Sequence, residues 1–163
     1  MRASKRRPDG TIDHSVDDGK DESYFEEAKK NVRRLADRYG VDMEVDLSRE
    51  VDSYDAQRVA LRAREAHPEA FEAFHRGVFD ALWEAGRDIG DSAVLEDIAT
   101  EAGLPAGYVE SVLADESSES ELQSAFEAAQ QRGITGVPTF VSGEHAARGA
   151  VPPEQLKRLI EGV

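Results

Sequence analysis

The sequence of 163 residues contains no cysteine. A chain without thiols forms no intrachain disulfide, holds no thiolate-ligated metal and performs no Cys-x-x-Cys redox chemistry with its own side chains. It also lacks an apolar run of the roughly 18 residues that a membrane-spanning helix needs, and no apolar stretch follows its basic start as in a secretory signal. These absences argue against a membrane partner and predict a cytoplasmic location.

Basic residues are few: 20 lysines and arginines stand against 34 aspartates and glutamates, giving a net charge of −14. Nucleic-acid binding needs a basic surface that neutralises phosphates, so we predict no nucleic-acid partner. Basic residues cluster only at the start, and we interpret this cluster as a frayed end, with a polybasic arm as the alternative: Arg2, Lys5, Arg6 and Arg7. Acidic residues along every later segment are typical of adaptation to high salt, so we expect folding to need molar salt.

Candidate catalytic and metal-binding groups are scattered. The serines cluster at expected helix starts and turns, and none stands in a pattern with a base. The four histidines show no ligand spacing such as i, i+4 on one helix, and we interpret His75, on an apolar helix face, as a core or boundary residue. The residues alone predict no catalytic residue, no metal site and no cofactor.

Helical periodicity dominates the chain. Residues 1–20 are polar with turn signals and predict a loop or a disordered lead-in. Apolar residues at three- to four-residue spacing predict helices over 24–39, 53–66, 68–85, 92–102, 104–114 and 118–132. We expect capping boxes at Ser23–Glu26 and Ser118–Glu121, and we expect the helix over 68–85, which has the widest apolar face, to be the most buried.

Strand signals are short. Alternation over 41–47 predicts a strand or an extended connector. Pro138 begins a strand over 138–142, because the first residue of a strand need not donate to the ladder. A turn and a weaker run over 145–148 complete a β-hairpin, and Pro153 opens a final helix. Val137–Pro138 is the best candidate for a cis bond, since X–Pro bonds lose most of the trans preference.

Four motifs occur in an order that carries a resemblance. They are Gly86–Asp91 with Val94-Leu95, then Ala102-Gly103-Leu104, then Ala128-Ala129 through Gly133–Val141 (GITGVPTFV), then Gly149–Pro153. With them the sequence resembles the DsbA family of thioredoxin-fold oxidoreductases, specifically its FrnE-like branch, with the 2-hydroxychromene-2-carboxylate isomerases as relatives. The resemblance covers about residues 8–163. It implies an α/β thioredoxin-like fold with a large helical insertion over 21–132, and residues 133–163 as the C-terminal part of the thioredoxin fold.

The resemblance also implies a site. In the family the proline of this loop is cis and faces the active-site Cys-x-x-Cys, while the residue before it offers backbone groups to a bound peptide or thiol. We therefore expect Gly136, Val137, Pro138 and Thr139 to bind substrate. Glycine beside the proline fits this role, because a backbone without side chains lets another chain approach closely.

One part of the family pattern has no counterpart here. The family's first βαβ unit, with its Cys-x-x-Cys, precedes the position of Pro8, so this chain is mostly α with a C-terminal hairpin and a final helix. We expect the DNA upstream of Met1 to encode about 45–60 further residues in frame, the size set by one such unit. The strand over 138–142 then lacks a neighbour, and its free edge is a template for association, including a homo-oligomer.

The sequence leaves three alternative hypotheses for the function. The first is a DsbA-family thiol–disulfide oxidoreductase that is redox-inactive as written. The second is a non-enzymatic module that binds a peptide or protein through the Pro138 loop and the open sheet edge. The third is a relative of glutathione-dependent isomerases.

Overall fold

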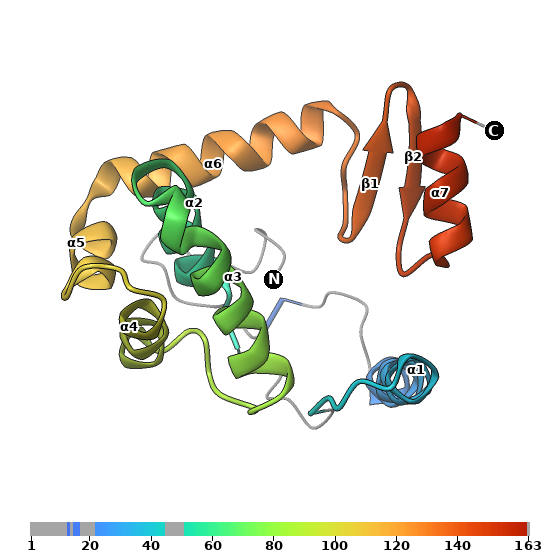
Figure 1. The fold of residues 1–163 in the computed structure, drawn as a ribbon, viewed down its shortest axis with the longest axis horizontal. Coiled ribbons are helices and arrows are strands. Elements are labelled where there is room, and N and C mark those ends of the chain that lie inside the picture. The colour runs from blue at the N-terminus through green and yellow to red at the C-terminus, as the bar shows by residue number, and fades with distance from the viewer. Residues whose placement is uncertain (1–12, 14, 17–21, 45–50, 163) are drawn as a thin grey trace. The chain divides into compact units, whose positions relative to one another are not determined.

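The computed structural model describes residues 13, 15–16, 22–44 and 51–162, so the expected lead-in over 1–20 lies almost entirely outside the described residues. Within the described ranges the chain forms seven helices and one two-stranded sheet (Figure 1). They are α1 (Glu22–Tyr39), α2 (Tyr54–Ala66), α3 (Pro68–Trp83), α4 (Ser92–Glu101), α5 (Tyr108–Ala114), α6 (Glu116–Gln131), β1 (Thr139–Ser142), β2 (His145–Arg148) and α7 (Pro153–Glu161). Among these helices, none is both long and apolar enough to cross a membrane.

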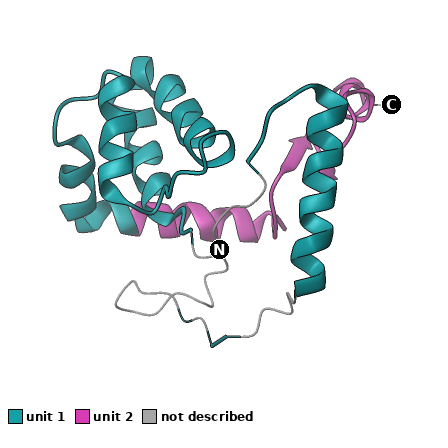
Figure 2. Cartoon of the chain, turned by 90° about the horizontal axis from the view of Figure 1, so that it is seen from below, with its two compact units in different colours: residues 1–119 teal, residues 120–163 magenta. Residues whose placement is uncertain are grey.

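The elements divide into two compact units, residues 1–119 and residues 120–163 (Figure 2). Helix α6 begins in the first unit and ends in the second. The boundary that the sequence suggested, between residues 132 and 133, stays a prediction.

Helices α2 to α5 form the core of the first unit. Helix α2 packs against α3 and α5, and α4 packs against the same two helices. The largest fully buried apolar side chains are Phe74, Leu95, Val59 and Val109, one from each of the four helices. Apolar residues that repeat every three to four positions place these side chains on one face of each helix.

Helix α2 buries more residues than α3, so the prediction that the helix over 68–85 is the most buried is wrong. Five residues of α2 are buried, and three of α3. Three small side chains of α2, Ala56, Val59 and Ala63, are almost fully covered by neighbouring helices, whereas the wide face of large rings on α3 extends beyond what α2 and α4 cover. Phe79 is 53% exposed, and His75, expected in the core or at its boundary, is exposed.

Neither predicted capping box starts its helix. Helix α1 begins at Glu22, which places Ser23 inside its first turn. Helix α6 begins at Glu116, and the Asp115 carboxylate accepts a hydrogen bond from the Ser117 N–H at 2.9 Å. Asp115 therefore fills the capping role expected of Ser118.

Ser118 instead belongs to a buried polar cluster. Its side chain is 1% exposed, and its hydroxyl accepts hydrogen bonds from Arg58 Nε at 3.0 Å and Nη2 at 2.7 Å. The same guanidinium donates to the Leu113 carbonyl at 3.2 Å and the Asp115 carbonyl at 3.3 Å. Arg58 of α2 thus supplies a donor to the Leu113 carbonyl in the last turn of α5, where the helix leaves carbonyls without an internal partner.

Residues 41–44 form a connector and not the predicted strand, while residues 45–47 of that prediction lie outside the described residues. The Val41 N–H donates to the Ala36 carbonyl at 3.0 Å, which closes the end of α1. The Glu44 N–H donates to the carbonyl of Trp83, the last residue of α3. The N–H groups of Val41 and Glu44 thus bind carbonyls at the ends of helices, and residues 41–44 form no hydrogen-bonded ladder with another strand of the described chain.

The second unit contains the predicted β-hairpin and final helix. Strands β1 and β2 are antiparallel, with Phe140 opposite Ala147 and Ser142 opposite His145. Helix α7 packs against both strands. Its start at Pro153 agrees with the sequence, because proline at the first helical position loses no hydrogen bond.

Candidate functional site

The candidate site is the loop that joins α6 to β1. Helix α6 ends in a Schellman motif, in which the Gly133 N–H donates to the Gln130 carbonyl at 2.8 Å and the Ile134 N–H donates to the Ala129 carbonyl at 3.0 Å. Gly133 has a φ of 73°, which favours glycine because a Cβ is strained there. The motif fixes the direction in which the loop leaves the helix.

The loop turns at a cis peptide bond between Val137 and Pro138, as the resemblance implied. Three hydrogen bonds hold this turn. The Thr139 hydroxyl donates to the Gly136 carbonyl at 2.7 Å, and the Gly149 N–H donates to the Pro138 carbonyl at 2.8 Å. The third runs from Arg148 Nη2 to the Gly133 carbonyl at 3.1 Å.

All four sequence-predicted residues lie in this single turn. Gly136, Val137 and Pro138 are exposed, and Thr139 is half-buried at the start of β1. The Val137 side chain is 91% exposed. A Cβ added to Gly136 would meet no atom within 4 Å. The backbone of the loop is therefore held in place from within while its outer side is open to another molecule.

Strand β1 continues this open surface along one edge. The bond from Gly149 to Pro138 and the pairing of Phe140 with Ala147 face β2. Backbone groups alternate in direction along a strand, so the N–H and C=O of Thr139 and Val141 point the other way. In the described part of the chain the sheet consists of β1 and β2 alone, which leaves that edge of β1 without a neighbouring strand.

The loop offers backbone groups and apolar side chains. Residues 133–139 contain no acid, base or thiol. Across the described ranges no group of three histidine, cysteine, aspartate or glutamate side chains could hold a metal ion. What the loop and the edge do supply is unpaired backbone donors and acceptors, together with apolar side chains at Val137 and Val141.

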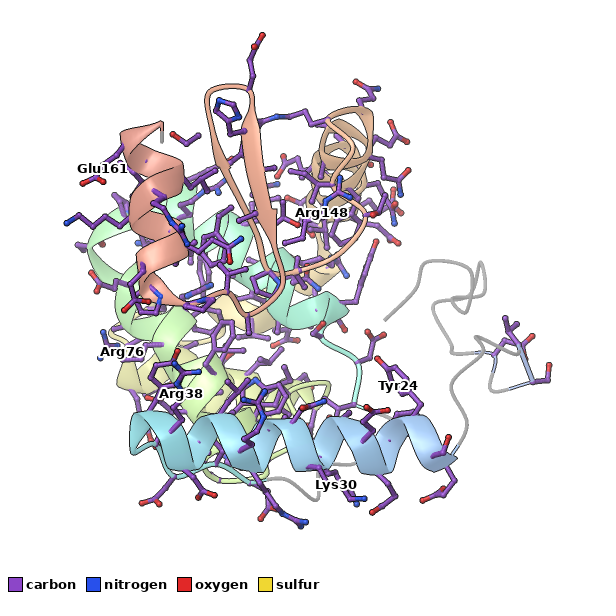
Figure 3. All side chains as sticks on the ribbon, turned by 90° about the vertical axis from the view of Figure 1, so that its right-hand side faces the viewer. Tyr24, Lys30, Arg38, Arg76, Arg148 and Glu161 are labelled. Carbon is purple, nitrogen blue, oxygen red and sulfur yellow. The ribbon has the colours of Figure 1, made fainter. Side chains whose placement is uncertain are left out.

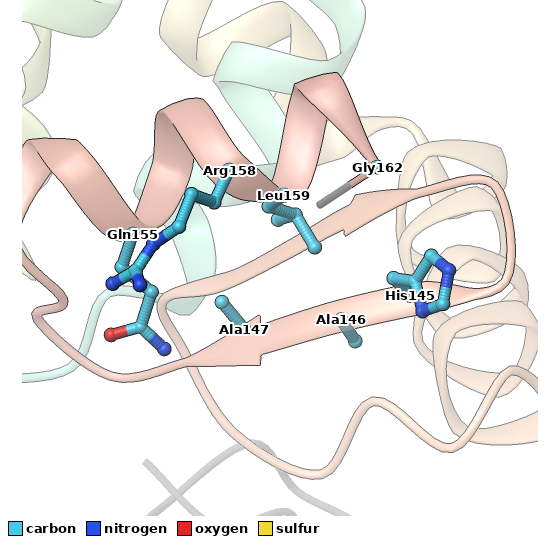
Figure 4. A pocket seen from close by; sticks show the side chains of 7 residues that line it. All are labelled: His145, Ala146, Ala147, Gln155, Arg158, Leu159 and Gly162. Atoms are coloured by element: carbon cyan, nitrogen blue, oxygen red, sulfur yellow. The ribbon is translucent and has the colours of Figure 1, made fainter.

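A separate hollow of about 410 Å³ lies between β2 and α7 (Figure 4). Ala147 and Leu159 point into it, and the side chains of Gln155 and Arg158 lie side by side at one end. None of its lining residues belongs to the loop over 133–139, so the hollow is not part of the candidate site.

Sequence reasoning missed two residues that support the loop, Arg148 and Gly149. Both act across the hairpin: Gly149 follows the last residue of β2, and Arg148 pairs with Thr139 in the register of the strands. Arginine in a weak strand and glycine after it carry no local signal for this role. Only the strand register brings them to the loop.

Comparison with known proteins identifies the family. The DSBA-like thioredoxin domain model matches residues 11–161. This chain belongs to that family. The resemblance to the DsbA family is confirmed, while its FrnE-like branch stays a prediction, and the fold is a DsbA-like thioredoxin fold that is mostly helical with a small sheet. The cis-proline turn at Pro138 lies within the matched range.

Individual relatives cover the chain to different extents. The uncharacterized protein YwbO of Bacillus subtilis is 30% identical over 104 residues, which span 56% of this chain and 52% of YwbO. A solved structure of a "probable DsbA oxidoreductase" from Streptomyces coelicolor matches with a TM-score of 0.72 and 26% identity, covering 86% of this chain and 60% of that one. This chain thus corresponds to about half of YwbO and somewhat more of the Streptomyces protein.

The isomerase relatives named by the resemblance share the fold. A 2-hydroxychromene-2-carboxylate isomerase matches with a TM-score of 0.73, covering 92% of this chain and 70% of that enzyme, at 18% identity. Similarity at that level of identity shows that the two proteins share a fold, and it is no evidence of isomerase activity in this chain.

Proposed function

We propose that this chain binds an extended peptide or a thiol compound at Gly136–Thr139, as the substrate-binding part of a DsbA-type thiol–disulfide oxidoreductase. One observation carries the proposal: in a DSBA-like domain, three hydrogen bonds hold the loop around Pro138, and the outer side of its backbone is open. The 163 residues by themselves perform no thiol–disulfide exchange.

Exchange requires a thiolate that attacks a disulfide sulfur. The chain has no cysteine, so it supplies neither the attacking nor the resolving sulfur. An insulin-reduction assay with dithiothreitol should therefore proceed at the uncatalysed rate when this protein is added. Turnover proportional to protein concentration would refute this part of the proposal.

Binding is tested separately with reduced insulin B chain whose thiols are alkylated and which carries a fluorescent label. Gly136→Val should weaken binding at least about tenfold, roughly 1.4 kcal/mol, because the new side chain occupies the space through which a peptide reaches the loop. Gly136 has no positive φ, so valine fits the backbone. Ala128→Val, at an exposed position of α6, is the control and should bind like the wild type. Equal affinities for both variants would place binding elsewhere.

The outward-facing groups of β1 favour a second mode, in which a peptide or a second copy of the chain adds a strand to this edge. Val141→Pro removes an outward N–H without removing a bond to β2. If strand addition takes place, this variant loses peptide affinity, and any self-association seen by light scattering disappears. If only Gly136→Val reduces binding, the loop acts without the edge.

A further inference from the structure

Helix α1 has a clean amphipathic pattern but no buried residue. None of the main helix-to-helix packing within the described ranges involves it. The second half of its apolar face carries these residues at three- to four-residue spacing: Ala28, Val32, Leu35, Ala36 and Tyr39. Helices in proteins gain most of their stability by packing such a face. A surface that covers this face would therefore stabilise α1.

Helix α3 presents a matching surface. Phe71, His75 and Phe79 follow each other at four-residue spacing, and their ring centroids are 5.4 Å and 5.0 Å apart. His75 and Phe79 are exposed, while Phe74 on the neighbouring face is fully buried in the core. These three rings, the aromatic stripe, lie beside the face that α3 packs into the core.

The chain between the two helices limits how they can meet. The hydrogen bond from Glu44 to Trp83 fixes the connector to the last residue of α3. The four residues from Val41 to Glu44 span at most about 14 Å, whereas the axes of packed helices lie about 8–10 Å apart. Helix α1 can therefore reach α3 only with the C-terminal ends of both helices on the same side, which makes the two helices parallel.

The spacing of the two faces agrees in this orientation. Ala28, Val32 and Ala36 repeat every four residues, as the aromatic stripe does. One constant offset of 43 residues puts Ala28 opposite Phe71, Val32 opposite His75 and Ala36 opposite Phe79. Small side chains then face large rings, so the two rows complement each other in size.

The charges also agree. Helix α1 has five basic and four acidic side chains, a net charge of +1. Helix α3 has three acidic side chains and one basic, a net charge of −2. Opposite net charge favours this pairing over contact between two acidic helices.

We propose that α1 closes over the aromatic stripe of α3 as a parallel strap, with Val32 against His75. The strap concerns the first unit and is independent of the peptide site proposed above. Its closure covers the exposed rings of α3 with the one apolar helix face that the connector brings within reach.

Engineered cysteines test the strap directly, because the chain has no other thiol. The double variant Val32→Cys/His75→Cys should form an intrachain disulfide at least about tenfold faster than Lys30→Cys/His75→Cys, because a disulfide needs Cα atoms within roughly 7 Å. Lys30 is the matched control, because a residue two positions before Val32 projects from nearly the opposite side of the helix. In Figure 3 its side chain points away from the side that carries Tyr24, a ring at the start of the same apolar face. Equal rates would overturn the proposal, and so would disulfides formed only between chains.

Trp83 gives a second measurement, because it is the only tryptophan and ends α3. Val32→Asp should open the strap and shift the Trp83 emission to longer wavelength. Asn31→Asp adds the same charge at an exposed position and should leave the emission unchanged. An identical emission spectrum for the two variants, with the total helical content of both unchanged by circular dichroism, would contradict closure.

Discussion

The two units of this protein differ in how they use apolar residues. Of the buried apolar side chains in the described part, all but Leu122 and Ala147 belong to the first unit. The second unit exposes Val137, Phe140 and Val141 around its cis-proline loop. A packed helical core supplies stability, whereas a two-stranded hairpin is marginal alone and keeps its edge available. The candidate site therefore lies in the unit with the smaller core.

The two units also differ in net charge. Residues 120–163 contain five acidic and four basic side chains, a net charge of −1, so the remaining −13 falls on residues 1–119. The acidic surface is a property of the first unit. A peptide that approaches the loop of the second unit meets little net charge nearby on the same unit.

The largest effect expected is on the core. Phe74→Ala should reduce the free energy of unfolding by about 3–5 kcal/mol, because Phe74 is fully buried and alanine leaves a cavity. Phe140→Ala, at a side chain that is 38% exposed in the second unit, should cost clearly less. Denaturant unfolding followed by circular dichroism measures both. Equal losses would contradict the contrast between the units.

Substitution of the buried Arg58 should cause the next largest loss of stability. Arg58→Met leaves the Leu113 carbonyl and the Ser118 hydroxyl oxygen without the donor that Arg58 supplies, at a cost of about 1–3 kcal/mol. Arg62→Met removes an ion pair with Asp115 that is partly exposed, which typically contributes only about 0–1 kcal/mol. The same unfolding experiment compares them, and an equal or greater loss for the Arg62 variant would show that the buried cluster adds little.

Salt should act mainly on the first unit. Because we expect folding to need molar salt, screening of this unit's negative charge in molar potassium chloride should raise the melting midpoint by at least about 2–4 °C, the shift that roughly 1 kcal/mol gives at this chain length. Hydrogen exchange resolved by peptide should show the increased protection in α2 to α5 and little change in the hairpin. An equal increase in protection in both units, or an unchanged melting midpoint, would contradict the assignment of the salt effect to the first unit.

The smallest effect concerns pH. Hydrogen bonds from the Ser117 hydroxyl and N–H, together with the Arg62 guanidinium, lower the pKa of Asp115 below its usual 3.8. A lowered pKa means that the folded state holds this proton less tightly than the unfolded state, so stability is present above pH 3.8 and is lost as the pH falls further. Asp115→Asn should make unfolding less dependent on pH between about pH 5 and pH 2. Because the carboxylate faces solvent, the change should be slight, and a steeper dependence would contradict it.

Local features were well predicted from the sequence. The helix limits of α1, α2 and α4 agree within two residues, and the hairpin and the start of α7 agree with their turn and proline signals. Helix α5 begins later than expected, at Tyr108, because Gly107 has a φ of 72°. The loop and the start of β1 could be placed because glycine, proline and β-branched residues act through the backbone of their own segment, whereas the cis bond at Pro138 was implied by the family resemblance.

The sequence by itself determined the helical segments, the position of the cis-proline loop and the absence of any thiol. Tertiary structure decided that α2 is the most buried helix and that the side chain of His75 is exposed. It also decided that the Ser118 hydroxyl accepts a hydrogen bond from Arg58 and does not cap α6, and that Arg148 supports the loop. The periodicity of a segment shows that it has an apolar face, but it does not show which neighbour covers that face. The partners of Arg58 and Arg148 are far away in sequence, and only the packing of helices and the register of strands bring them within hydrogen-bonding distance.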